Sequence, residues 1–252
     1  MQPYAWTWNE ETLVFVPLLA AAYALAVRRV GAPHWRIACF AVAALLLFAF
    51  GVSPLHELAV HYLLLVHLLQ NVVLAEWAPL LLVLSLPPVF ARVLAEPRAM
   101  RALTRPVVAM PLWLANYAVW HVPLLYDAAL RRPHTLLHLE HLAYLATGVL
   151  MWWPVFEDAP QRLKAGGRAN YVFAGFVLAA PIGLVLALVP HAAYATYRHA
   201  PERLWGLSAL ADQQLGGVTM AGEQAIVFFA VFTLWFFRFL AEQEHPEDAP
   251  PR

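Results

Sequence analysis

The sequence predicts an all-α, polytopic membrane protein: a bundle of seven transmembrane helices with its N-terminus outside and its C-terminus in the cytoplasm. Three observations support this fold class, namely the composition, the spacing of the apolar runs and the distribution of basic residues. The 252-residue chain is 62% hydrophobic and only 13% charged, whereas soluble domains are about half apolar and a quarter charged. This composition indicates that lipid, not water, surrounds most of the surface.

Seven apolar runs along the chain are suited to cross a bilayer as helices, which takes about 20 residues each. Each run is bounded by charged residues, prolines or both. The loops between them are short, so we expect residues 1–252 to form a single integral membrane domain. The predicted spans lie at about residues 12–27, 35–52, 58–86, 106–120, 136–156, 170–189 and 215–240.

The basic residues set the predicted orientation, because Lys and Arg concentrate in short loops on the cytoplasmic side. With seven spans, 12 of the 16 Lys and Arg residues fall on the side of the C-terminus. The other side holds only Arg131, Arg132, Arg198 and Arg203. The N-terminus is therefore predicted to be outside, and the outer loops are residues 53–57, 121–135 and 190–212.

Charge and cysteine content exclude several classes of function. The formal net charge is zero and like charges form no block, so nucleic-acid binding is not expected. Cys39 is the only cysteine, which excludes an intramolecular disulfide and a Cys-x-x-Cys motif. The first apolar run has no basic region before it, so we expect it to remain as a span and not to be a cleaved signal peptide.

Polar residues inside the third predicted span indicate a functional interior. His56 and His67 are 11 positions apart, which places them on the same face of a continuous helix. Gln70 and Asn71 continue the polar face one turn beyond His67. Such residues are costly within a membrane and usually face a polar interior.

Most of the histidines are predicted to lie at the outer ends of helices or in outer loops. They are His56, His61, His121, His134, His138, His141, His191 and His199.

The fifth and seventh predicted helices carry further polar groups. His134, His138 and His141 follow the i, i+4, i+7 spacing and predict a stripe at the outer end of the fifth helix. In the seventh helix Met220 precedes Glu223 by one turn, and Glu223 should lie well inside the membrane. Gly216 and Gly217 should permit close contact between helices. Aromatic residues near helix ends are typical of interface belts, and this interpretation applies to Trp120, Trp152 and Tyr194.

These residue types restrict the chemistry without choosing a single cofactor. Imidazoles with a thioether and a carboxylate suit copper, and paired neutral imidazoles also suit haem iron. Neither His56 nor His138 begins a His-Glu-x-x-His motif, so a zinc protease is not expected. A retinal protein needs a lysine within the membrane, and the only lysine, Lys164, falls in a loop.

Four stretches together resemble the CtaG family of bacterial cytochrome c oxidase assembly factors. Their order and spacing cover roughly residues 50 to 240 of this chain. They are His67-Leu-Leu-Gln70-Asn71, the segment WHVPLLYDAAL from Trp120 to Leu130, the segment from Leu137-His138-Leu-Glu140-His141 through Trp152-Trp153-Pro154, and the segment Ala211-Asp212-Gln213-Gln214-Leu-Gly-Gly217 through Met220.

The resemblance implies a multi-pass protein of the bacterial cytoplasmic (inner) membrane that assists assembly of a haem-copper oxidase. It implies copper binding and handover without catalytic turnover. The implied partners are cytochrome c oxidase subunits, a periplasmic copper chaperone and the lipid bilayer. The residues expected to hold copper are His67, His121, His138, His141 and Met220. The residues expected to orient the imidazoles by hydrogen bonding are His56, Gln70, Asn71, Glu140 and Asp212.

One position departs from the family pattern, because Asn71 stands where the family motif resembles a second histidine. An amide oxygen is a poorer copper ligand than imidazole, so His56 or His61 could take that place, or the motif could be a polar packing feature. Three other functions stay open from the sequence: a membrane cytochrome with two histidines on haem, a proton or ion transporter using Glu223, Asp212 and His67, and a metal-free scaffold for oxidase subunits.

Overall fold

The computed structural model describes residues 2–244, and within that range the secondary structure is entirely helical. Two five-residue π-helical segments, η1 (Val73–Trp77) and η2 (Pro133–Leu137), and the 3₁₀ turn η3 (Leu204–Gly206) accompany the α-helices. The α-helices are α1 (Glu10–Val30), α2 (His34–Val52), α3 (Pro54–His61), α4 (Leu64–Val72), α5 (Ala78–Ser85), α6 (Pro88–Ala95), α7 (Arg98–Leu103), α8 (Pro106–Trp120), α9 (Pro123–Leu130), α10 (His138–Phe156), α11 (Ala165–Leu188), α12 (Ala195–Arg198) and α13 (Ala209–Glu244).

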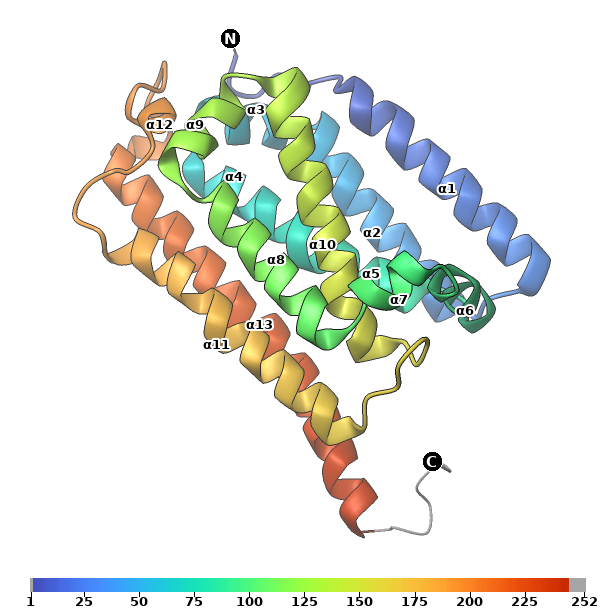
Figure 1. The fold of residues 1–252 in the computed structure, drawn as a ribbon. Coiled ribbons are helices and arrows are strands. Elements are labelled where there is room, and N and C mark those ends of the chain that lie inside the picture. Colours follow the sequence, from blue (N-terminus) through green and yellow to red (C-terminus); the bar gives the residue numbers. More distant parts are fainter. Residues whose placement is uncertain (1, 245–252) are drawn as a thin grey trace.

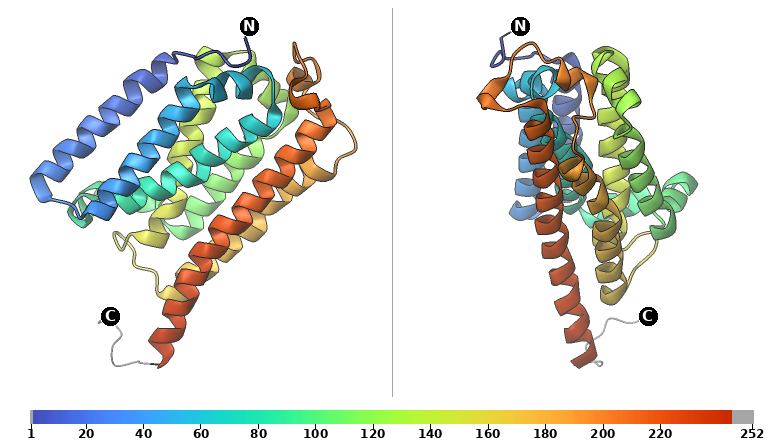
Figure 2. Two further views of the ribbon diagram at one scale, coloured as in Figure 1. Left: turned by 180° about the vertical axis from the view of Figure 1, so that it is seen from behind. Right: turned by 90° about the vertical axis from the view of Figure 1, so that its left-hand side faces the viewer.

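The long helices run side by side between two ends of a bundle (Figure 1). The short helices α3, α9 and α12 lie at one end, which we call the α12 end, and α6 and α7 lie towards the other. Figure 2 shows that α13 follows α11 along the length of α11. The loops predicted to be on the outer side, residues 53–57, 121–135 and 190–212, all belong to the α12 end.

Five helical segments in the described part of the chain are long and apolar enough to cross a membrane. They are Glu10–Val30, His34–Val52, Leu64–Ser85, Ala165–Leu188 and Ala209–Glu244, and a sixth arises if α8 and α9, bent by 75°, count as one broken span. Large apolar side chains such as Ile226, Phe229 and Leu188 are exposed, as expected for a surface covered by lipid. The all-helical fold with five or six candidate membrane spans is therefore confirmed, whereas the count of seven spans and the orientation stay predictions.

The third predicted span, 58–86, is wrong as one continuous helix. The chain is extended at Leu63, between α3 and α4, and then passes through the π segment η1 before α5. The break at Leu63 is stabilised from elsewhere in the fold, since Asp212 of α13 accepts hydrogen bonds from the backbone N–H groups of Leu64 and Leu65. Apolar composition alone does not reveal such a tertiary contact.

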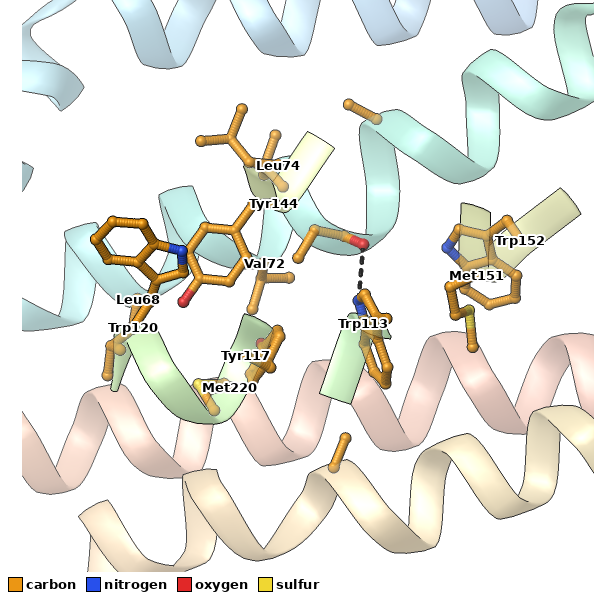
Figure 3. Close-up of a cluster of buried hydrophobic side chains, with 14 of the residues drawn as sticks. Leu68, Val72, Leu74, Trp113, Tyr117, Trp120, Tyr144, Met151, Trp152 and Met220 are labelled. Carbon is orange, nitrogen blue, oxygen red and sulfur yellow. Dashed lines mark hydrogen bonds between the residues drawn. The ribbon is translucent and has the colours of Figure 1, made fainter. Parts of the chain in front are cut away.

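Two tryptophans hold the π segment η1 in place. A π turn widens the helix and leaves backbone carbonyls available to side chains. The indole of Trp113 donates to the Ala75 carbonyl at 3.3 Å, and that of Trp152 donates to the Glu76 carbonyl at 3.0 Å. The dashed line at Trp113 in Figure 3 marks the first of these two hydrogen bonds. The interface-belt prediction for Trp120, Trp152 and Tyr194 is wrong, because these side chains are buried.

Helix α13 contacts its two neighbours through adjacent glycines. A Cβ atom added at Gly217 would lie 2.6 Å from the Gly183 carbonyl oxygen of α11, and one added at Gly216 would lie 2.8 Å from the Leu68 side chain of α4. The close helix contact predicted from these glycines is confirmed. It places α13 against α4, the helix that carries His67.

Candidate functional site

Helix α4 brings three polar side chains into the interior of the bundle. His67, Gln70 and Asn71 are all buried, with exposed fractions of 0%, 2% and 0%. The helix lacks a cap from its own N-terminal side chain, and the Asp212 carboxylate supplies one at 2.8 and 3.0 Å. We expected Asp212 to hydrogen bond an imidazole. It instead fixes the first turn of α4, which positions His67 through the backbone.

The tautomer of His67 follows from its contact with Tyr197 of α12. The Tyr197 hydroxyl donates its one hydrogen to the Ala59 carbonyl at 2.5 Å. The same hydroxyl lies 2.7 Å from His67 Nδ1, so it accepts the Nδ1–H of the imidazole. The lone pair of neutral His67 is therefore on Nε2, a buried atom with no hydrogen-bond partner in the described part of the chain.

His121, in the bend between α8 and α9, has the same arrangement. Its Nδ1 lies 2.8 Å from the Tyr117 carbonyl oxygen, and a carbonyl can only accept, so Nδ1 carries the hydrogen. Nε2 of His121 is also buried and without a partner among the described residues. Both imidazoles thus have a fixed Nδ1–H and a free Nε2 lone pair, as histidines that bind metals usually do.

Glu140 of α10 lies next to His67. Its Oε1 atom is 4.0 Å from His67 Nε2 and accepts a hydrogen bond from the Asn71 amide at 3.2 Å. Its Oε2 atom is buried and has no partner in residues 2–244. Asn71 thus contacts the carboxylate as a hydrogen-bond donor.

His56 and His141 extend the polar cluster towards α3 and α10, with ring centroids 6.3 Å apart. Gln70 links His56 to α4, since its amide nitrogen lies 3.3 Å from His56 Nδ1 and donates to the Phe50 carbonyl at 3.0 Å. Burial lowers the pKa of His56 to about 4, so this imidazole is neutral at neutral pH. His141 is buried and its Nε2 atom, too, has no partner within the described range.

A frame of tyrosines surrounds the histidines, and sequence reasoning missed it. The Tyr126 ring lies 5.0 Å from the His67 ring and 6.2 Å from the His121 ring, centroid to centroid. The Tyr194 ring is tilted by 34° to the Tyr126 ring, with centroids 4.1 Å apart, and its hydroxyl donates to the His121 carbonyl at 3.1 Å. In the sequence, the only indication of this contact was that Tyr126 lies in the same segment, WHVPLLYDAAL, as His121.

Two further polar side chains hold this frame at the α12 end. Asp127 accepts hydrogen bonds from the backbone N–H groups of Ala195 and Thr196 at 3.0 and 2.9 Å, which caps α12 and places Tyr197. Gln213 accepts from the N–H of Ala193 at 2.7 Å. These residues of the family-like segments therefore have structural partners.

The structure places two predicted copper ligands outside the histidine cluster. His138 is half-exposed and pairs with Glu11 of α1, 3.4 Å away. Met220 is buried in the apolar core that includes Tyr117, Trp113 and Leu68 (Figure 3). The predicted stripe of His134, His138 and His141 thus divides, since only His141 points into the cluster.

The cluster contains atoms that can bind a metal ion, but they do not form a complete metal site. These atoms are Nε2 of His67, His121 and His141 and Oε2 of Glu140, none of which has a hydrogen-bond partner among the described residues. Within residues 2–244 no three His, Cys, Asp or Glu side chains lie close enough together to hold a metal ion. The cavity that reaches the cluster, lined by Glu11, Gln70 and His141 among others, has a volume of about 60 Å³.

Comparison with known proteins places the chain in a family. Two uncharacterized proteins, from Mycobacterium bovis and Mycobacterium tuberculosis, are each 29% identical to it over 178 residues, which are 60% of this chain and 26% of each relative. The chain thus spans about a quarter of the length of these relatives. No solved structure matches it significantly. The family of cytochrome c oxidase caa3 assembly factors (Caa3_CtaG) matches residues 21–242. The chain therefore belongs to the cytochrome c oxidase caa3 assembly factor family.

Proposed function

We propose that this protein assists assembly of a haem-copper cytochrome c oxidase in the bacterial inner membrane by holding a copper ion and handing it to the oxidase. The observation that carries the proposal is the pair of buried imidazoles, His67 and His121, each with Nδ1–H fixed by an oxygen acceptor and Nε2 without a partner. Buried polar atoms are normally hydrogen-bonded. Two free Nε2 lone pairs in an apolar interior are suited to a metal ion.

The donor set favours copper over harder ions. Imidazole nitrogen is a good ligand for copper, whereas Mg²⁺ and Ca²⁺ prefer sets of oxygen ligands. We assign His67, His121 and His141 as the nitrogen donors and Glu140 as the adjacent carboxylate. Copper is the cargo in this proposal, so no catalytic turnover is required, and a ligand set that completes only when copper arrives suits an ion that must leave again. A periplasmic copper chaperone is the proposed source of the ion.

The space around the cluster argues against haem. Pockets for drug-sized ligands have volumes of about 300–1,000 Å³, and the cavity at His141 has about 60 Å³. A larger cavity of about 480 Å³ lies among α1, α2, α5, α6 and α10, and no histidine lines it. A haem clamped by two of the clustered histidines would need a rearrangement of Tyr126, whose ring lies against both His67 and His121.

Copper retention by the purified protein tests the proposal. We expect near-stoichiometric copper after anaerobic loading with Cu(I) and removal of excess ion. The His67→Ala/His121→Ala double variant should retain almost none, because it lacks both free Nε2 atoms. His191→Ala is the matched control, since the exposed His191 side chain lies outside the cluster, and it should bind like the wild type. Equal, low copper in all three proteins would contradict copper binding and favour a metal-free scaffold for oxidase subunits.

The Tyr197→Phe variant should bind copper more weakly while keeping the ligands themselves. The Tyr197 hydroxyl fixes the Nδ1–H tautomer of His67, and loss of such a partner typically lowers metal affinity by about 10- to 100-fold. Competition with a Cu(I) chelator measures the effect. Tyr171→Phe is the control, because the buried Tyr171 hydroxyl has no hydrogen-bond partner among the described residues. Equal affinities in both variants would show that Tyr197 does not orient His67 for binding.

A further inference from the structure

A second buried polar cluster lies where α13 passes the π segment η1. Glu76 of η1 is fully buried, and Glu223 of α13 is partly exposed. Glu76 follows His67 by nine residues, which is about 13 Å along the helix axis. Both carboxyl groups lie near the middle of candidate membrane spans, Leu64–Ser85 and Ala209–Glu244.

Each carboxyl group has one N–H donor. The Gln224 amide donates to Glu76 Oε1 at 2.6 Å, and the Trp77 indole donates to Glu223 Oε2 at 2.6 Å. The two carboxyl groups also lie within hydrogen-bonding reach of each other. The π turn is the local cause of this arrangement, because it changes the direction in which Glu76 leaves the helix, and such turns recur at functional sites.

The remaining oxygens of the cluster lack donors. Glu76 Oε2, Glu223 Oε1 and Gln224 Oε1 are buried atoms that receive no N–H or O–H hydrogen within residues 2–244. Gln224 is itself fully buried, with its amide nitrogen directed at Glu76. Three acceptor oxygens without a donor indicate a positively charged or hydrogen-supplying ligand between them.

The charges around the pair indicate that this ligand is a proton. The titratable group that faces both carboxyls from α8 is Tyr117, whose hydroxyl hydrogen-bonds with the Glu76 carboxyl and lies 3.4 Å from Gln224 Nε2. No basic side chain is among the described groups that interact with either Glu76 or Glu223. Two carboxylates in contact in an apolar medium repel each other strongly, and a shared proton removes that repulsion.

We infer that Glu76 and Glu223 form a proton-binding site in the membrane interior, separate from the histidine cluster. Glu223 carries the proton and donates it to the Glu76 carboxylate. Loss of the proton leaves two adjoining carboxylates, which weakens the contact between α13 and η1. The inference does not depend on copper binding.

Infrared difference spectroscopy of the purified full-length protein tests this site. The measured signal is the C=O band of a protonated carboxyl group. The wild type should show the band of Glu223 at neutral pH, with a shift in D₂O. Glu223→Gln should lose it. Glu76→Gln should still show the band at neutral pH. As the pH is raised, however, the band should disappear at a lower pH than in the wild type, since a neighbouring carboxylate no longer favours protonation of Glu223. Glu57→Gln, which changes the half-buried Glu57 at the α12 end, should behave as the wild type.

Three results would overturn the inference. The first is an unchanged band in Glu223→Gln. The second is a Glu76→Gln variant that titrates like the wild type, and this measurement decides the question even if Glu223→Gln does not fold. The third is loss of the wild-type band at fixed pH when choline is replaced by Na⁺, which would assign the site to a monovalent metal cation.

Discussion

Replacing Gly217 with alanine is expected to prevent stable packing of α13 against α11. A Cβ atom at this position would lie 2.6 Å from the Gly183 carbonyl oxygen and 2.6 Å from the Ala187 nitrogen. Both are backbone atoms of a helix, so neither can move aside as a flexible side chain would. Overpacking in a protein interior typically costs about 1–3 kcal/mol, and a clash with backbone atoms should cost at least the upper end of that range. The lower stability should appear as loss of monodisperse protein in detergent.

Gly222→Ala on the same helix is the matched control. A Cβ atom there has no heavy atom within 4 Å, and alanine favours a helix over glycine by about 1 kcal/mol. The thermal unfolding temperature of Gly222→Ala should therefore equal or exceed that of the wild type. If Gly217→Ala were as stable as Gly222→Ala, the close contact between α11 and α13 would be wrong.

Removal of the Asp212 carboxylate has the second large expected effect. The Asp212 carboxylate accepts hydrogen bonds from the backbone N–H groups of Leu64 and Leu65 at 2.8 and 3.0 Å. In Asp212→Ala both N–H groups lose their acceptor. Each buried donor left unpaired costs about 1–3 kcal/mol, and the negative charge at the start of α4 is lost as well. The variant should be less stable by about 2–6 kcal/mol, and His67 should become less well placed, since it lies one turn further along α4.

Hydrogen exchange measured by mass spectrometry separates this effect from a general loss of stability. The first turn of α4 should exchange faster in Asp212→Ala than in Asp212→Asn, which keeps one acceptor oxygen. The exposed carboxylate of Glu202 supplies the control variant, Glu202→Ala, which should exchange like the wild type. Unchanged protection of residues 64–67 in Asp212→Ala would rule out this cap.

Apolar runs predicted the helices well wherever the chain crosses the bundle without a break. The predicted runs 12–27 and 35–52 lie within α1 and α2. The runs 170–189 and 215–240 overlap α11 and α13, which begin at Ala165 and Ala209. Helix α13 begins earlier than predicted, at Ala209, because Asp212 and Gln213 are buried by partners on other helices. Hydropathy counts such residues as solvent-exposed, so it starts the run too late.

The residues of the candidate site were predicted only in part, for a similar reason. His67, Gln70, Glu140 and His141 stand out as polar side chains within apolar runs, and the structure brings them together. Tyr126 and Tyr197 do not stand out, because tyrosines near helix ends also occur in interface belts. Their contacts with His67 join residues 59 and 130 positions apart, and no local pattern encodes such pairs.

The 75° bend between α8 and α9 bears on the rate at which the proposed copper ion would be released. It lays α9 across the α12 end beside α12 (Figure 1), so Tyr126 and Tyr197 cover His67 and leave it with no exposed surface. An ion bound beneath this cover cannot be reached by a competing ligand while the cover is closed. Release would then be governed by the frequency with which α9 and α12 separate, and the oxidase could accelerate it by engaging those two helices without binding copper more tightly.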